Sequence, residues 1–244
     1  MKLTNEEVEM PCSIEVKNLV KSFGKVCAVD NVSFTAYPSQ IIALLGPNGA
    51  GKSTLMNMIA GFLSQTSGYV KIFDKNNSLY SIETKKEVGF LPEGAPLYAD
   101  MSVESFLKYM AELKSLSKDE VKKVMALANI ENVAKQKIET LSKGYKRRVG
   151  FAVGILGNPP ILLLDEPTDG LDPNQKEHML GLIKDMSKDK TIIISTHLLD
   201  EAETIANRIM IMNKGKIKVD GDLEAIMKQT RTSSLENAFI KVTR

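Results

Sequence analysis

Cysteine is scarce in this chain, and long apolar runs are absent from it. The two cysteines, Cys12 and Cys27, have no metal-site spacing and form no disulfide framework, so we expect reduced and inert thiols. No apolar run approaches the ~20 residues that cross a bilayer. Three glutamates in the first nine residues stand where a signal peptide needs an apolar stretch. We therefore expect neither a membrane-spanning helix nor secretion.

A marked excess of either charge is also missing. The chain has 32 basic and 30 acidic residues, and its formal net charge is +2. Such a balance gives no reason to expect a nucleic-acid partner. The basic run of Lys143, Lys146, Arg147 and Arg148 could be a nucleic-acid patch, but a cluster of this kind is more often a solvated helix face. We therefore expect no nucleic acid to bind.

Apolar residues follow two patterns, and each predicts one kind of sheet. Between residues 14 and 34, apolar and polar residues alternate, as in half-buried strands of an antiparallel sheet. The runs at residues 41–45, 161–164 and 192–194 are continuous instead. Continuous apolar runs are typical of parallel strands that helices cover on both faces. The sequence therefore predicts an α/β core with a mixed or parallel sheet and an N-terminal antiparallel β subdomain.

Helices are predicted between and after these strands. Residues 104–113 and 118–128 carry apolar side chains at helical spacing, within a helical stretch inserted into the core. Asp172 followed by Pro173 predicts an N-cap and first turn of a helix that runs toward Ser187. We therefore divide the chain into an N-terminal extension (1–13), a main domain (14–218) with a helical subdomain inserted at about 95–158, and a C-terminal tail (219–244).

A glycine-rich segment follows the first continuous apolar run. Residues 46–53 satisfy the pattern G-x-x-x-x-G-K-[ST] of phosphate-binding loops, in which backbone N–H groups surround the phosphates. Lys52 would reach the β- and γ-phosphates, and the Ser53 hydroxyl would bind Mg²⁺. An ordinary glycine-rich turn is the alternative, but a strand before the loop and a helix after it favour a nucleotide site. The predicted nucleotide-binding residues are Gly46, Pro47, Asn48, Gly49, Ala50, Gly51, Lys52, Ser53 and Thr54.

Polar residues end the other two continuous runs. Asp165 closes the second run and would hold the Mg²⁺ shell, while Glu166 could accept a proton from an attacking water. His197 follows the third run, whose strand should be parallel to the other two and end at the same sheet edge. The pair of acids could instead be an ordinary helix cap, and His178 is interpreted as a solvated helix position.

The segment Leu141-Ser142-Lys143-Gly144-Tyr145 resembles the signature loop of ATP-binding-cassette (ABC) ATPases, usually Leu-Ser-Gly-Gly-Gln. The resemblance extends over residues 14–218. Physically the segment is a second helix start, where Ser142 can cap and the N–H groups around Gly144 can bind an anion. The resemblance implies a head-to-tail dimer in which each ATP lies between residues 46–54 of one subunit and 142–145 of the other.

Further roles are implied by the resemblance, and some positions depart from it. Phe23 takes the place of the aromatic residue that stacks on adenine, residues 169–172 resemble the segment that crosses the dimer interface, and His197 matches the histidine that contacts the γ-phosphate. The first signature glycine is Lys143, and the glutamine is Tyr145. Glu93 stands where the family usually offers glutamine to Mg²⁺; its carboxylate can still bind the metal, with one extra negative charge.

The implied protein is the ATP-hydrolysing subunit of an ABC transporter. Its catalytic residues would be Glu166, His197 and Lys52, its Mg²⁺ ligands Ser53, Glu93 and Asp165, and its cofactors ATP and Mg²⁺. Its expected partners are a membrane permease and a second ABC subunit, at the inner face of the cell membrane in the cytoplasm. Residues 235–240 resemble the C-terminal segment of exporters. An importer subunit and a soluble ABC ATPase outside transport are the alternatives.

Overall fold

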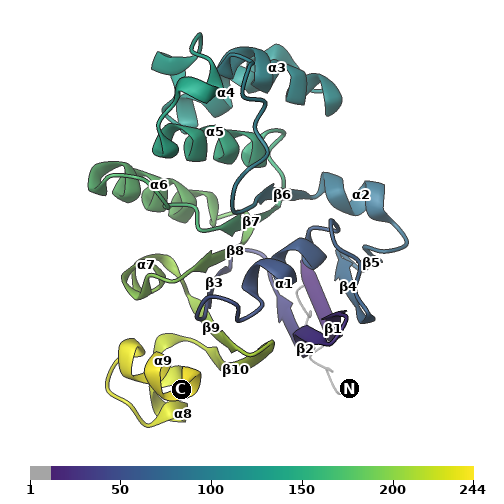
Figure 1. The fold of residues 1–244 in the computed structure, drawn as a ribbon, viewed down its shortest axis with the longest axis vertical. Helices are drawn as coiled ribbons and strands as arrows, with labels where there is room; N and C mark the ends of the chain where they lie inside the picture. Colours follow the sequence, from purple (N-terminus) through teal and green to yellow (C-terminus); the bar gives the residue numbers. More distant parts are fainter. Residues whose placement is uncertain (1–11) are drawn as a thin grey trace, which may run out of the picture.

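The fold contains a six-stranded sheet with helices on both faces and a smaller four-stranded sheet (Figure 1). The structure is a computed structural model that describes residues 12–244, so residues 1–11 of the predicted extension lie outside the described residues. The strand order of the large sheet is β10-β9-β3-β8-β7-β6, and only β10 pairs antiparallel. Its strands are β3 (Ile41–Leu45), β6 (Val88–Leu91), β7 (Ile161–Asp165), β8 (Thr191–Thr196), β9 (Arg208–Asn213) and β10 (Lys216–Gly221).

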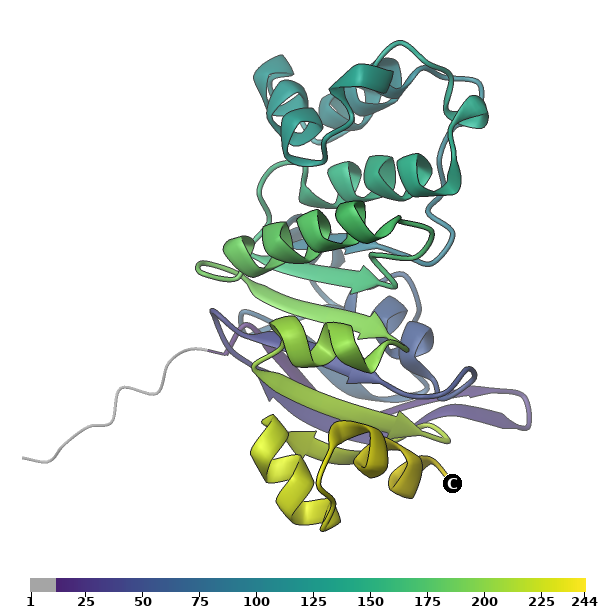
Figure 2. The same cartoon turned by 90° about the vertical axis from the view of Figure 1, so that its left-hand side faces the viewer.

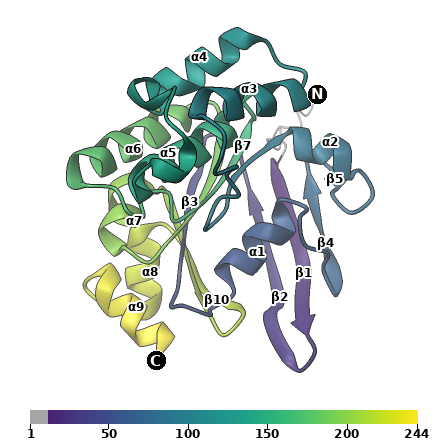
Figure 3. The ribbon, with the colours of Figure 1, turned by 45° about the horizontal axis from the view of Figure 1, so that its top comes forward.

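The small sheet is antiparallel, as the alternating pattern predicts. Its order is β2-β1-β4-β5, and its strands are β1 (Ile14–Phe23), β2 (Val26–Ala36), β4 (Ser67–Ile72) and β5 (Lys75–Asn76). Its buried side chains share one apolar core with helix α1 (Lys52–Ile59) and with one face of the large sheet. The small sheet and α1 therefore cover that face together, as Figure 3 shows.

The continuous apolar runs follow from coverage of both sheet faces. In β3, Ile42 and Leu44 join the core with α1, whereas Ala43 and Leu45 join a core on the opposite face. Each such Leu or Ile side chain contributes ~1.5–3 kcal/mol on full burial. Helices α6 (Pro173–Met186) and α7 (Leu199–Ile205), drawn in green, lie on this opposite face in Figure 2.

The helical subdomain lies at one end of the molecule. It contains α3 (Val103–Leu113), α4 (Lys118–Leu127) and α5 (Lys143–Ile155), and the short helix α2 (Ser81–Lys86) precedes β6. Side chains of α3, α4 and α5 form one core that continues under α6. The helices predicted at 104–113 and 118–128 are present, and Asp172 caps α6 by accepting a hydrogen bond from the N–H of Gln175 at 2.9 Å.

The last residues pack onto the sheet. Helices α8 (Leu223–Thr230) and α9 (Leu235–Thr243) bury Ile226, Leu235 and Ala238 against side chains of β9. The division predicted after residue 218 therefore falls inside β10, and the segment after it shares a core with the main domain. Within residues 12–244, no helix has the length and apolar character needed to cross a membrane.

Candidate functional site

The loop at residues 46–53 requires glycine at its last turn. Gly51 precedes α1 with a left-handed φ of 105°, and a Cβ atom there would lie 2.2 Å from the carbonyl oxygen of Ala28. Any side chain at this position would therefore collide with the backbone of β2. The close approach fixes the start of α1, so the backbone N–H groups at its positive end face the space where a phosphate would bind.

Lys52 is the first residue of α1 and is buried. Its Nζ donates hydrogen bonds to the carbonyl oxygens of Gly46 at 2.6 Å and Pro47 at 3.2 Å. Burial lowers the pKa of Lys52, and the negative charges of Glu166, Asp165 and Glu93 oppose that shift. The side chain is thus held over the loop with three carboxylates nearby.

The ends of β7 and β8 bring Glu166 and His197 together. Both carboxylate oxygens of Glu166 lie 3.0 Å from Nδ1 of His197, and the N–H of Glu166 donates to the carbonyl oxygen of Ser195 at 2.8 Å. Glu166 has a φ of 52°, which is unusual for a residue other than glycine and turns its side chain away from the line of the strand. Burial raises the pKa of Glu166, while the contact with His197 lowers it.

Most of the predicted nucleotide-binding residues line one cavity of about 460 Å³. The cavity lies between β2, the phosphate loop and the ends of β6 and β7, and Ala28 is a lining residue that the sequence did not indicate. The predicted residues that line it are Phe23, Asn48, Gly49, Ala50, Gly51, Lys52, Ser53, Thr54, Glu93, Asp165 and Glu166. Phe23 is 51% exposed, and the ammonium group of Lys21 lies 5.0 Å from the centroid of its ring.

The donor set in this cavity fits Mg²⁺. Oδ2 of Asp165 is buried and has no hydrogen-bond partner within the described residues, which is an unusual arrangement for a carboxylate oxygen. Ser53 and Glu93 line the same cavity, and hydroxyl and carboxylate oxygens are the ligands that Mg²⁺ takes. A cation beside Asp165 would satisfy this oxygen.

The signature segment lies apart from this cavity. Ser142 caps α5 by accepting from the N–H of Tyr145 at 3.3 Å, and Lys143 forms an ion pair of 2.8 Å with Asp169. The Tyr145 ring contacts Arg148, and its hydroxyl accepts from Asn132 at 2.7 Å, so this side chain points into the helical subdomain. A Cβ at Gly144 would approach the carbonyl oxygen of Gly170 to 2.8 Å, so α5 lies against residues 169–172. The structure thus does not bring residues 142–145 to this cavity of their own chain.

Two buried charged residues near the site were missed from the sequence. Glu201 is 1% exposed and accepts hydrogen bonds from Thr168 and Thr196, so it links the segments that follow Glu166 and precede His197. In the sequence, only its position four residues after His197 could have indicated that Glu201 lies near the site. Arg147 is 8% exposed, so the interpretation of the basic run as a solvated face is wrong for Arg147, and equally for Arg148 at 4%.

Comparison with known proteins identifies the family of this chain. Residues 29–169 match the ABC transporter family. This chain belongs to the ABC transporter ATP-binding proteins. It is 33% identical over 224 residues to YxlF of Bacillus subtilis, an uncharacterized ABC transporter ATP-binding protein, with 90% of this chain and 74% of that protein covered.

A second relative and two solved structures agree with this assignment. The lantibiotic transport ATP-binding protein SrtF of Streptococcus pyogenes is 33% identical over 212 residues, with 86% of this chain and 91% of SrtF covered. An ATP-binding subunit of an ABC transporter superposes with a TM-score of 0.87 at 28% identity, covering 95% of this chain and 99% of that one. A bacterial ABC transporter cassette solved as a dimer superposes with a TM-score of 0.80 at 26% identity, covering 86% and 98%. The ABC protein described here is accordingly an ATP-binding subunit and an ATPase.

Proposed function

We propose that this ABC subunit powers export through a separate membrane permease and hydrolyses ATP with Glu166 as the general base. The observation that carries the catalytic part is the contact of Glu166 with His197 at the edge of a cavity lined by Lys52 and Asp165. A carboxylate whose pKa is raised by burial is suited to accept a proton from water near neutral pH.

The other side chains of the site neutralise the charge of the phosphates and position the reacting groups. The ammonium group of Lys52 would exchange its two carbonyl partners for phosphate oxygens, which form stronger, charge-assisted hydrogen bonds. His197 holds the Glu166 carboxylate and is 59% exposed, so it is accessible to a γ-phosphate. Ser53, Glu93 and Asp165 would hold Mg²⁺, which supplies neutralisation of the phosphate charge.

A second ABC subunit completes each site in this proposal. Ser142 is exposed at a helix start outside its own chain's cavity, where its hydroxyl is suited to bind the γ-phosphate of ATP held by another cassette. Gly144 follows in the first turn of the same helix and is buried against Gly170. The similarity to a cassette solved as a dimer supports this arrangement.

An apolar groove is suited to receive the membrane partner. It has a volume of about 430 Å³, lies between the large sheet and the helical subdomain, and is lined by Phe62, Phe90, Leu97, Phe106 and Met110 among others. Phe62 is 66% exposed at its rim. A helical segment on the cytoplasmic side of a permease would bury these side chains and place this subunit at the inner face of the membrane.

Recovery of the complex from membranes tests this role. The tagged chain should co-purify with a protein that has several membrane-spanning segments, and Phe62→Asp should abolish the co-purification. Leu79→Asp is the matched control, because Leu79 is equally apolar and 77% exposed but does not line the groove. Equal loss with both variants, or recovery of no membrane protein with the wild-type chain, would contradict the proposal.

Export is favoured over import by the likeness to SrtF, whose name assigns it to lantibiotic transport, and by the resemblance of residues 235–240 to exporters. The recovered complex in proteoliposomes should hydrolyse ATP without an added soluble cargo-binding protein. Hydrolysis that depends on such a protein would indicate the importer alternative.

A further inference from the structure

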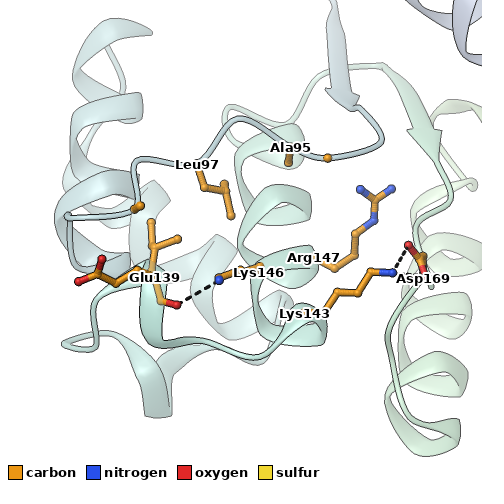
Figure 4. A pocket seen from close by; sticks show the side chains of 10 residues that line it. Ala95, Leu97, Glu139, Lys143, Lys146, Arg147 and Asp169 are labelled. Carbon is orange, nitrogen blue, oxygen red and sulfur yellow. Dashed lines mark hydrogen bonds and ion pairs between the residues drawn. The ribbon is translucent and has the colours of Figure 1, made fainter.

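Arg147 joins three functional segments of the chain. It lies on α5, one turn after Lys143, and its side chain is buried. Its Nε donates to the carbonyl oxygen of Glu166 at 2.9 Å, and its Nη1 donates to the carbonyl oxygen of Pro92 at 2.7 Å. Figure 4 shows Arg147 beside Lys143 and Asp169 at the wall of a pocket. One guanidinium therefore contacts the backbone of the general base and the residue directly before Glu93.

The burial of this cation is poorly explained by stability alone. Its Nη2 is buried with no hydrogen-bond partner within residues 12–244, and no carboxylate in that range forms an ion pair with it. A buried arginine with an unsatisfied nitrogen is costly, and an apolar side chain of similar size is often at least as stabilising. The negative charges that act on its guanidinium are those of Asp165, Asp169, Glu166 and Glu93, and all of these except Asp169 line the nucleotide cavity. The arrangement thus favours a role in the site over a role in the core.

We propose that Arg147 is a positioning residue, which holds the backbone of Glu166 and the Glu93 loop in register with the helix that begins at Ser142. This inference rests on the proposed function, in which Glu166 is the base and Ser142 meets the ATP of another subunit. The two contacts fix the carbonyl groups on which the directions of the Glu166 and Glu93 side chains depend. Movement of α5 against a neighbouring subunit would consequently move both carboxylates, so each site would respond to the closure of the other.

Three variants separate this role from a structural one. Arg147→Met removes both hydrogen bonds and the charge, whereas Arg147→Lys keeps the charge and loses the planar two-way contact. Arg208→Met is the matched control, because Arg208 also donates to a backbone carbonyl, that of Thr35 at 2.7 Å, and pairs with Asp220 far from the cavity. Mg-ATP binding, kcat and KM for ATP are measured for each, with the folded fraction determined by denaturant titration.

We expect Arg147→Met to lower kcat by about 10- to 100-fold, as a misplaced catalytic group does, with KM for ATP unchanged. Arg147→Lys should also lower kcat, because it loses the planar two-way contact, with KM for ATP again unchanged. Arg208→Met should reduce stability without changing kcat or KM for ATP.

The outcomes distinguish this inference from the proposed function. If Glu166→Gln is inactive while Arg147→Met keeps the wild-type kcat, the positioning role is wrong and the base stands. If Arg147→Met loses activity only in proportion to its unfolded fraction, or Arg208→Met lowers kcat equally, Arg147 is structural. Activity retained by Glu166→Gln would overturn the proposed function itself.

Discussion

The two helix starts that carry the phosphate-binding segments are built differently. Before α1, Gly51 has a left-handed φ of 105° and no side chain caps the helix, whereas before α5 Ser142 is extended, with φ −61° and ψ 161°, and caps the helix itself. In the first loop, the buried Lys52 donates hydrogen bonds to carbonyl groups of that same loop, whereas Ser142 is exposed. The first site is thus assembled within one chain and tolerates little change. The second is an ordinary capped helix start, and in the proposed function its ligand is bound to the surface of another subunit.

The largest expected effect is a loss of turnover at Glu166, a residue that belongs to neither helix start. Glu166→Gln should lower turnover by roughly 10²- to 10⁴-fold, because the acceptor for the proton of water is lost, while ATP binding remains. A dimer bound to ATP should then accumulate, and sizing chromatography with Mg-ATP measures it. Hydrolysis at the wild-type rate would show that another group is the base.

The second prediction compares the two starts directly. Lys52→Ala should weaken ATP binding by an isolated subunit by roughly 10- to 100-fold, the value of a hydrogen bond to a charged group, and should abolish turnover. Ser142→Arg should leave that binding intact and block only ATP-dependent dimerisation, through bulk and a misplaced cation. Equilibrium binding with a fluorescent ATP analogue and sizing chromatography give the two readings.

A mixture of these two variants sharpens the comparison. Each mixed dimer has one intact composite site and one site with both defects, so activity above that of either variant alone is expected. Strong ATP-dependent dimerisation of Ser142→Arg by itself would refute the shared site and make the two helix starts independent.

The third prediction concerns stability without nucleotide. Gly51→Ala places a Cβ against the Ala28 carbonyl and requires a left-handed alanine, which alone costs about 1–2 kcal/mol. Ser142→Ala removes a helix cap worth ~0.5–2 kcal/mol, and the long 3.3 Å contact at an exposed position places it at the lower end of that range. Urea denaturation of both variants measures the difference. Equal destabilisation by the two substitutions would mean that the loop before α1 rearranges to accommodate the added Cβ.

The smallest expected effect lies at the metal. Glu93→Gln keeps an oxygen ligand but removes a negative charge, so binding of ATP should persist while a higher Mg²⁺ concentration is needed for half-maximal rate. Glu93→Ala, which removes the oxygen, should be more damaging. A Mg²⁺ response unchanged in both variants would place Glu93 outside the metal site.

The sequence predicted local features well where the backbone itself imposes them. The pattern at residues 46–53 needs Gly46 and Gly51 for close packing, and the continuous apolar runs follow from burial on both faces, so both could be interpreted before the structure was known. The position of His197 at the same sheet edge as Glu166 was expected from parallel strands that end there, whereas their direct contact was not predicted. The structure adds that the nitrogen in contact is Nδ1 and that both oxygens lie at 3.0 Å.

Contacts between distant segments could not be predicted from the pattern. Arg147 stands in a basic run, and nothing in that run indicates that its guanidinium is buried between Pro92 and Glu166, which lie 55 and 19 residues away. Tyr145 occupies a signature position, yet its hydroxyl accepts a hydrogen bond from Asn132 on the surface of the helical subdomain. Such partners depend on how α5 lies against the rest of the fold, and no single-sequence periodicity contains that information.

The buried ammonium group of Lys52 has a consequence for proton exchange. Because burial lowers its pKa in the free protein, alkaline conditions remove its proton before those of exposed lysines. The phosphates of ATP favour the ammonium form, so the pKa of Lys52 rises when nucleotide binds. Above the pKa that Lys52 has in the free protein, binding of ATP is therefore coupled to uptake of a proton from the buffer. The affinity for ATP consequently declines as pH increases. The heat of ATP binding at such pH values then depends on the ionisation enthalpy of the buffer, so calorimetry in two different buffers measures the number of protons taken up.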